Sequence, residues 1–289
     1  MRKQVLSLMA LLAISFSLKA QTTGGPDAYG YIWRNELDAS GPVYNWVEID
    51  GLFTTVEITD LTDDNVSVQA ITLANPFHFY WYDVSTIRVG SNGYITFSGS
   101  TNIASGANGF PAIPTPGAQN NDFIAGFMSD LIFGPTAGNQ GRCYYNLSIN
   151  SDSLVITYDS VPFWDQALGY TGYNTFQIIL AYADSSILVQ YKAQSGASAA
   201  GVGFFSAGIE NNSGTIGLQY MFDTYPIGGS AVKYYYPAST TLAINDASTT
   251  YNDNVENGAI FLSRNGAPFS TLSLYVVEAS LIASVVDAG

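Results

Sequence analysis

The sequence predicts an all-β protein, an antiparallel β-sandwich with long irregular loops. Short apolar segments alternate with polar turns at intervals of roughly 8 to 14 residues, a spacing typical of sandwiches and barrels. After the first twenty residues, no stretch of ten or more shows the apolar period of an amphipathic helix. The clearest signal is 87–97, Ile-Arg-Val-Gly-Ser-Asn-Gly-Tyr-Ile-Thr-Phe, where two alternating runs flank an Asn-Gly turn.

The first twenty residues have the layout of a secretory signal peptide. Basic Arg2 and Lys3 precede an apolar run from Val5 to Phe16, and Ala20 ends a cleavage region. The run is too short for a membrane-spanning helix, and the alternative is a buried N-terminal helix. We expect residues 1–20 to be removed and the mature protein to be secreted or to lie at the cell surface, with no membrane span.

The chain is strongly acidic, with 9 Lys and Arg against 23 Asp and Glu and a formal net charge of −14. Removal of residues 1–20 would take away Arg2, Lys3 and Lys19, which leaves 6 basic residues against 23 acidic ones, a charge of −17. This balance disfavours nucleic acid and anionic membranes as partners and fits cations or basic partners.

The N-terminal half is expected to consist of short strands around one hairpin. Residues 21–65 are interpreted as leader strands packed on the main domain. Aromatic and β-branched residues predict strands near 29–34, 43–50, 56–58, 66–70 and 77–82, ahead of the 87–97 hairpin. In the aromatic run 77–82, alternation predicts Phe77, Phe79 and Trp81 on one face and His78, Tyr80 and Tyr82 on the other. The Ser-, Gly-, Asn- and Pro-rich stretch 98–121 is interpreted as a long loop, functional or disordered.

The C-terminal half continues the pattern. A near-continuous apolar run at 123–133 predicts a buried strand, since it is short and lies between loops. Alternating runs separated by polar turns predict further strands at 144–149, 154–158, 175–180, 187–191, 203–209, 217–221 and 232–236. Residues 66–238 are therefore expected to form the sandwich, and residues 239–289 a linker or the start of a further β module.

Cys143 and His78 are the only cysteine and the only histidine. A single cysteine cannot form an internal disulfide, so Cys143 is interpreted as a small buried apolar side chain. A thiol nucleophile or an intermolecular bridge is the alternative. Any catalytic triad or histidine metal site would have to use His78, which is interpreted as a packed structural histidine. No sequence pattern of a zinc protease, serine hydrolase or phosphate-binding loop is present.

Carboxylates supply the candidate metal ligands. Asp60, Asp63, Asp64 and Asn65 lie on one turn and offer the hard oxygen ligands that calcium prefers, without the order of an EF-hand. The alternative is a solvated acidic turn. A weaker candidate is 252–254, Asn-Asp-Asn. Asp122 precedes the apolar run 123–133 and Asp130 interrupts it, and a buried carboxylate there would need partners. Both are interpreted as caps of backbone amides, with a glycosidase pair as the alternative.

Exposed aromatic side chains are the candidate ligand-binding residues. The four tryptophans, Trp33, Trp46, Trp81 and Trp164, and the 20 tyrosines could stack on sugars. Trp164 is placed in a loop between strands, as an exposed binding residue or as a packed lid.

The order of several segments resembles nidogen-like extracellular domains. The 87–97 hairpin resembles their V-x-x-N-G-x-I-x-F hairpin, 123–131 their I-A-P-F-W-x-D segment, and 175–180 their T-F-Q-V-V-L strand. Arg142-Cys-Tyr-Tyr145 resembles their G-x-V-Y-Y strand, and 207–220 resembles the G-I-E-N…G-L-Q-Y ending of secreted surface proteins of Bacteroidota. Gly126 and Met128 depart from the Pro and Trp of the family pattern.

The resemblance implies an extracellular adhesion or scaffold module that carries no catalytic residues. In the bacterial group such modules often precede a sorting domain for type IX secretion. We therefore expect a non-enzymatic surface module that binds an extracellular protein or glycan, with calcium as the one cofactor hypothesis. The alternative function is a non-catalytic ancillary domain of a larger secreted protease or glycosidase.

Overall fold

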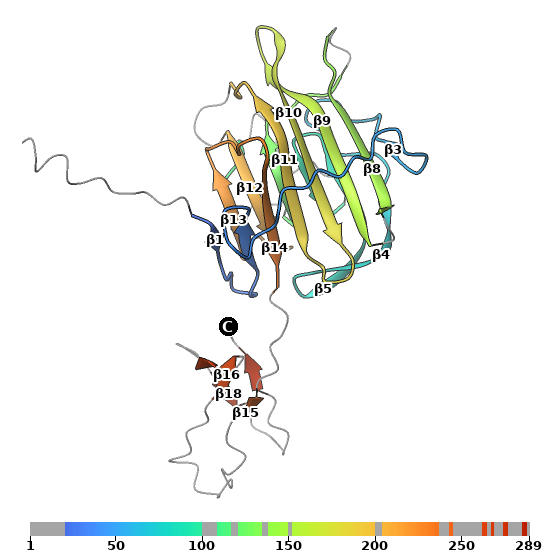
Figure 1. Cartoon of the computed structure of the whole chain (residues 1–289). Coiled ribbons are helices and arrows are strands. Elements are labelled where there is room, and N and C mark those ends of the chain that lie inside the picture. Colours follow the sequence, from blue (N-terminus) through green and yellow to red (C-terminus); the bar gives the residue numbers. More distant parts are fainter. Residues whose placement is uncertain are drawn as a thin grey trace, which may run out of the picture.

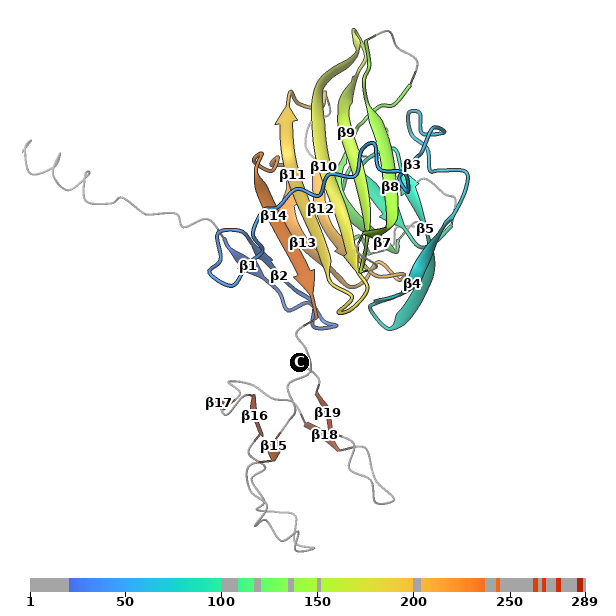
Figure 2. The same cartoon turned by 45° about the vertical axis from the view of Figure 1, so that its right-hand side comes forward.

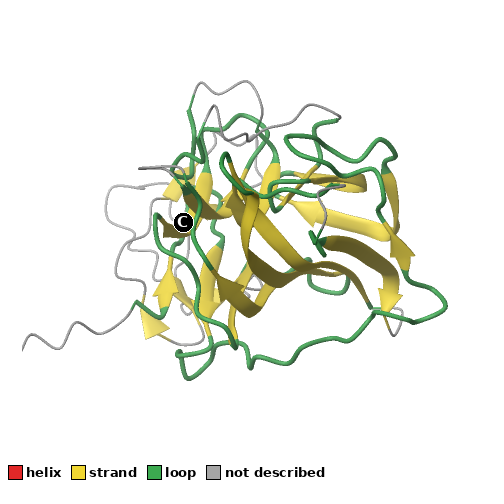
Figure 3. Cartoon of the chain, turned by 90° about the horizontal axis from the view of Figure 1, so that it is seen from above, coloured by secondary structure: helices red, strands yellow, loops and turns green. Residues whose placement is uncertain are grey.

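The structure is a computed structural model. It describes residues 21–99, 109–116, 121–134, 138–149, 152–199 and 204–236, together with five short strands between 243 and 287. Within these residues every regular element is a β-strand (Figure 3). Accordingly, no described element is a helix of the length and apolarity that a membrane crossing needs.

Fourteen strands build the main body. They are β1 (Thr23–Gly24), β2 (Ile32–Asn35), β3 (Val56–Glu57), β4 (Ile71–Phe79), β5 (Tyr82–Gly90), β6 (Tyr94–Thr96), β7 (Phe123–Ser129), β8 (Arg142–Ile149), β9 (Ser153–Asp165), β10 (Gly169–Ala181), β11 (Ile187–Ser195), β12 (Phe205–Glu210), β13 (Gly217–Phe222) and β14 (Ser230–Tyr235).

Two antiparallel sheets pack face to face, which confirms the predicted sandwich (Figures 1 and 2). The eight-stranded sheet has the order β1-β2-β14-β11-β10-β9-β8-β3, and the six-stranded sheet the order β13-β12-β7-β6-β5-β4. The large core between them contains the inward residues of both sheets. Phe176, Ile178 and Leu180 of β10 lie directly opposite Tyr191, Val189 and Ile187 of β11, and all six are buried.

The predicted hairpin at 87–97 is present, and its turn also packs against β7. Val89 pairs with Ile95 across the two strands. Gly93 takes the positive φ of 81° that the turn needs. It also has to be glycine for space, because a Cβ there would lie 1.9 Å from the Phe127 carbonyl oxygen. The turn is thus pressed against β7.

Tyrosine hydroxyls connect the two sheets across the apolar core. The buried Tyr158 hydroxyl donates to the Gly90 carbonyl at 2.8 Å, and the Tyr191 hydroxyl donates to the Gly126 carbonyl at 2.8 Å. A Cβ on Gly126 would lie 2.7 Å from the Ile178 side chain. The close approach of the sheets therefore explains the glycine at this position.

The strand expected at 43–50 is not formed, and the prediction is wrong for a physical reason. This segment, here called the strap, crosses the outer face of the eight-stranded sheet (Figures 1 and 2). Its backbone pairs with side-chain amides instead of a neighbouring strand. Gln190 accepts from the Asn45 N–H at 2.6 Å and donates to the Asn45 carbonyl at 2.8 Å. Gln177 bonds both backbone groups of Val47 in the same way. The side-chain amides of the two glutamines thus take the place of the backbone hydrogen bonds that a neighbouring strand would make.

Two other local predictions need correction. Residues 66–70 form only an isolated bridge, from Val66 to Gly90, so no strand lies there. The aromatic run 77–82 is split by a turn, because Tyr80 has a positive φ of 52° and Trp81 follows it. This reverses the alternation: Tyr80 is buried and Trp81 is exposed.

Residues 239–289 were expected to be a linker or the start of a β module. The described part consists of β15 (Ala243–Ile244), β16 (Leu262–Arg264) and β17 (Ala267–Pro268), paired in that order, and of β18 (Leu274–Val276) paired with β19 (Val285–Asp287). The candidate residues 252–254 lie outside the described residues.

Candidate functional site

The acidic turn that follows β3 is an ordered loop. The Asn65 side chain accepts from the Thr62 N–H at 2.8 Å and donates to the Asp60 carbonyl at 2.8 Å. The Asp60 carboxylate accepts from the Val68 N–H at 2.6 Å. Asp60 and Asn65 thus use their side chains to shape the loop, and the structure does not bring them together with Asp63 and Asp64 as a ligand set.

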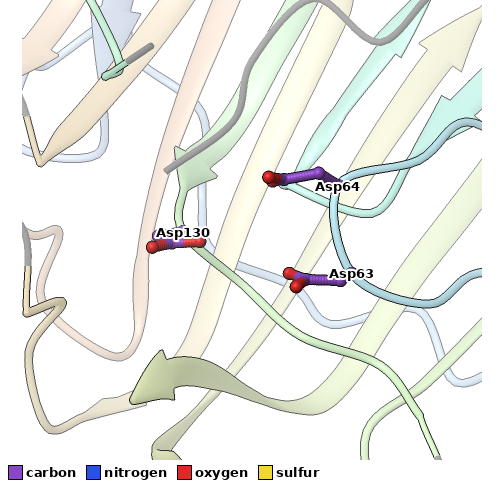
Figure 4. Close-up of side chains that lie close together, drawn as sticks. All are labelled: Asp63, Asp64 and Asp130. Atoms are coloured by element: carbon purple, nitrogen blue, oxygen red, sulfur yellow. The ribbon is translucent and has the colours of Figure 1, made fainter. Parts of the chain in front are cut away.

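Asp63 and Asp64 instead face Asp130, which comes from a different part of the chain (Figure 4). One carboxylate oxygen of each residue lies within 4.8 Å of the others. We call these three residues the carboxylate cluster. Asp63 and Asp64 are exposed, whereas Asp130 keeps 6% of its surface accessible. The cluster is therefore buried on the side of Asp130 and open to solvent on the side of Asp63 and Asp64.

Backbone and amide hydrogen bonds hold the cluster together. The Phe133 N–H donates to the Thr62 carbonyl at 2.7 Å, which joins the acidic loop to the chain after β7. Asn92 donates to Asp64 at 2.7 Å and accepts from the Leu131 N–H at 2.8 Å. The asparagine of the predicted Asn-Gly turn thus connects both halves of the cluster, which periodicity in the sequence could not reveal.

The three carboxylates of the cluster repel one another when neither a proton nor a cation is bound. Two unit charges 4.8 Å apart repel by about 1 kcal/mol in water and about 3.5 kcal/mol at an effective dielectric constant of about 20. Burial, followed by the charges of Asp64 and Asp63, raises the pKa of the Asp130 carboxyl to about 6. Either a proton or a cation would relieve this repulsion.

Sequence reasoning named two of the three cluster residues as metal ligands and gave the third another role. Asp130 was noted because it interrupts an apolar run and would need partners if buried. Its proximity to Asp63 and Asp64 arises only in the folded protein, since nearly seventy residues of chain separate them. The structure describes no backbone amide on its carboxylate, so the interpretation as a cap is wrong for Asp130.

Asp122 lies at the opposite end of β7 from Asp130. Its carboxylate accepts a hydrogen bond from the Tyr82 hydroxyl, which differs from the backbone cap that we expected. Eight residues of extended chain separate the two aspartates by about 26 Å. Paired carboxylates of glycosidases lie within about 10 Å of each other. Asp122 and Asp130 therefore cannot form such a pair.

A second group of exposed side chains surrounds the turn between β4 and β5. Trp81 is 57% exposed, and its ring packs edge-on against Tyr29 with centroids 4.8 Å apart. The Tyr236 ring also packs against Tyr29, with centroids 5.2 Å apart. We call Tyr29, Trp81 and Tyr236 the aromatic platform. It joins the start of the described chain, the β4–β5 turn and the end of β14.

Buried contacts support the platform from below. Asp27 accepts hydrogen bonds from the N–H groups of Tyr29, Gly30 and Tyr31 at 2.8–3.0 Å and from the Tyr80 hydroxyl at 3.1 Å. One carboxylate thereby fixes both the N-terminal loop and the turn that carries Trp81.

His78 lies beside the platform and is not the packed histidine that was expected. Its side chain is 48% exposed because it points outward from β4, opposite the buried Phe77 and Phe79. Its Nε2 is 2.9 Å from the Tyr29 hydroxyl and its Nδ1 is 2.8 Å from Asp83. The imidazole thus contacts no serine hydroxyl or thiol in the described part of the chain.

The remaining candidates are distributed over the molecule. Trp164 belongs to β9 and is half-buried, so its placement in a loop was wrong; its N–H donates to the Asp130 carbonyl at 2.9 Å. Trp33 is buried, and Trp46 of the strap packs against the Lys192 ammonium at 4.9 Å. Cys143 is a fully buried free thiol, as predicted, and burial raises its pKa.

Of the long stretch 98–121, the described part returns to the core. Phe110 is fully buried and Ile113 nearly so. The Thr115 hydroxyl and N–H both donate to the buried Glu210 carboxylate. Residues 100–108 and 117–120 lie outside the described residues, so the prediction of a functional or disordered loop stays a prediction for them.

Comparison with known families assigns the chain to a class that agrees with this architecture. The NIDO-related (nidogen-related) family matches residues 42–258, about three quarters of the sequence. The chain therefore belongs to the NIDO-related family, and the resemblance noted in the sequence is confirmed. No curated protein and no solved structure matches it.

Proposed function

We propose that this protein is a secreted or cell-surface binding module that holds an extracellular protein or glycan and catalyses no reaction. The observation that carries the proposal is the aromatic platform, on which Trp81 is 57% exposed and yet fixed by its neighbours. An exposed tryptophan of this kind offers a large apolar face for a ligand to cover.

The platform suits binding because its order is established before a ligand arrives. Tyr29 is held by Trp81, Tyr236 and the His78 imidazole, so little side-chain freedom is left to lose. Preorganised side chains bind more tightly than mobile ones for this reason. His78 and Asp83 add exposed polar groups beside the apolar rings, a combination that fits a sugar or a polar peptide.

The absence of chemistry is part of the proposal and rests on the two residues best suited to nucleophilic catalysis. Burial raises the pKa of the Cys143 thiol, which disfavours the reactive thiolate. Tyr29 and Asp83 engage both nitrogens of the His78 imidazole. The burial of Cys143 and the two partners of His78 both agree with a non-catalytic role.

The test is a binding screen of the full chain on glycan arrays and on immobilised extracellular matrix proteins, followed by Trp81→Ala. We expect the variant to lose at least tenfold in affinity for whatever the wild type binds, as for a tryptophan at the centre of an interface. Phe53→Ala is the matched control, because Phe53 is an exposed aromatic residue outside the platform. Equal affinity of Trp81→Ala and wild type would overturn the assignment of the platform.

A further inference from the structure

We propose that the carboxylate cluster of Asp63, Asp64 and Asp130 binds a divalent cation of the calcium type. The site differs from the turn of four residues that the sequence indicated, because Asp60 and Asn65 are engaged within their loop. It is also separate from the aromatic platform. Asp130 and Asn92 lie at the end of β5 marked by Gly90, whereas Trp81 precedes the start of β5.

The first argument is the state of Asp130. This side chain is more than nine-tenths buried and points toward Asp63 and Asp64 (Figure 4). Within the described part of the chain, neither a hydrogen-bond donor nor a Lys or Arg side chain contacts its carboxylate. A carboxylate with little access to water and no protein partner is costly to ionise, and a bound cation would stabilise its charged form.

The second argument is that hydrogen bonds hold together the chain segments that carry the three carboxylates. The Thr62 carbonyl is bonded to the Phe133 N–H, and Asn92 bridges Asp64 to Leu131. The Asn65 carbonyl also accepts from the Ser91 N–H at 2.8 Å. The scaffold therefore keeps three like charges together at an energetic cost, which is how preorganised cation sites are built.

The donor set identifies the kind of ion. Three carboxylates are hard oxygen ligands, and neither a histidine nor a cysteine is among them. Hard oxygen donors select calcium or magnesium over softer metals. Calcium accepts six to eight oxygens in irregular arrangements and magnesium requires an octahedron, so an open side completed by water favours calcium. Asp63 and Asp64 are exposed, which gives the ion a path to Asp130.

A cation here would fasten three segments of the fold. Asp63 and Asp64 belong to the loop after β3, and Asp130 follows β7 in the six-stranded sheet. Trp164 of β9, in the other sheet, donates its N–H to the Asp130 carbonyl. Calcium would thus stabilise the connection between the acidic loop and both layers of the sandwich.

The experiment measures calcium binding by the full chain, by titration calorimetry and by thermal unfolding in 10 mM calcium or in chelator at constant ionic strength. We expect one site, and a midpoint about 3–8 °C higher in calcium, as for an extracellular site of submillimolar affinity. Asp130→Asn and Asp63→Asn should each abolish the shift. Because Asp63 is exposed, its variant guards against failure of Asp130→Asn to fold.

Asp60→Asn is the matched control, since Asp60 belongs to the same loop and faces Val68 instead of the cluster. The Asp60→Asn variant should keep the full rise of the unfolding midpoint in calcium. Magnesium should raise the midpoint less than calcium. The proposal is overturned if calcium produces no shift, if magnesium produces an equal one that survives Asp130→Asn, or if Asp60→Asn abolishes the shift as effectively as Asp63→Asn.

Discussion

Asp130 is a carboxylate placed where a buried strand ends beside an acidic loop, and this position changes its affinity for a proton. β7 is buried along its whole length, and Asp130 is the first residue after it. Burial and two neighbouring carboxylates raise its pKa to about 6 from an ordinary 3.8. The folded state therefore binds the proton of this carboxyl more tightly than the unfolded state does.

This shift predicts a pH dependence of the metal-free protein. Between pH 4 and 6 the folded state holds more protons than the unfolded state, so the free energy of unfolding falls as pH rises. In chelator, the free energy of unfolding of the wild type should fall between pH 4.5 and 7.5 by about 2 kcal/mol more than that of Asp130→Asn. Urea unfolding at both pH values measures the difference. Parallel pH profiles of the two proteins would contradict the raised pKa.

Gly126 and Tyr191 make a second point at the residue scale. The resemblance to nidogen-like domains drew attention to Gly126 as a departure from a family pattern. In the structure a side chain at this position would meet Ile178 of the facing sheet, while the Gly126 carbonyl accepts from Tyr191. The glycine thus allows the two sheets to approach closely and to share a hydrogen bond.

At the scale of elements, the strap is the least conventional part of the fold. It covers outer-face residues of the eight-stranded sheet, so that Ile49, Tyr144, Val155 and Ile179 form a small second core. Gln177 and Gln190 are fully buried beneath it. Their amide groups bond the N–H and carbonyl of strap residues as a neighbouring strand would.

Removal of one of these amides should loosen the strap. Gln177→Ala leaves both backbone groups of Val47 without their partner and also removes the bond to the Thr157 hydroxyl. A buried polar group that loses its partner costs about 1–3 kcal/mol, so we expect a loss of that size in the free energy of unfolding. Urea denaturation followed by tryptophan fluorescence measures it.

Gln194→Ala provides the control for this prediction. Gln194 lies on β11, is partly exposed, and its amide donates to the nearby Gly196 carbonyl at 2.8 Å. Its replacement should change the free energy of unfolding by less than about 0.5 kcal/mol. Equal losses from both variants would mean that the buried amides do not hold the strap.

At the scale of the whole molecule, the N-terminal strands are part of the sandwich. β2 pairs with β14 and β1 pairs with β2, so together they extend one end of the eight-stranded sheet, and β3 forms the other end. Tyr31 and Trp33 are buried in the large core. The Trp33 indole also donates to the Gln219 carbonyl of the other sheet at 3.0 Å.

This arrangement predicts that a chain starting at residue 66 will not fold cooperatively. Such a truncation removes the strap, β1 to β3 and the buried Tyr31 and Trp33, and it exposes the edge of β14. A chain starting at residue 21 should unfold in a single sharp transition. Differential scanning calorimetry compares the two. A sharp transition in the shorter chain would show that the 66–238 boundary defines an independent domain.

Much of the fold was predictable because its signals are local. Alternation of apolar residues at 87–97, 175–180 and 187–191 identified strands and their buried faces, since side chains of a strand alternate by backbone geometry alone. Gly93 identified a turn because few other residues take its φ. The single cysteine was enough to exclude an internal disulfide and to predict a buried Cys143.

Tertiary structure decided everything that required two distant segments to meet. The strap looked like a strand because its residues suit one, but the partners of its backbone are glutamine side chains. Alternation placed Trp81 on the same strand face as Phe77 and Phe79 because it assumes a straight strand, and a turn at Tyr80 ended that strand. Asp130 joined Asp63 and Asp64 only through folding, because the separation of charged groups in space is independent of their spacing along the chain.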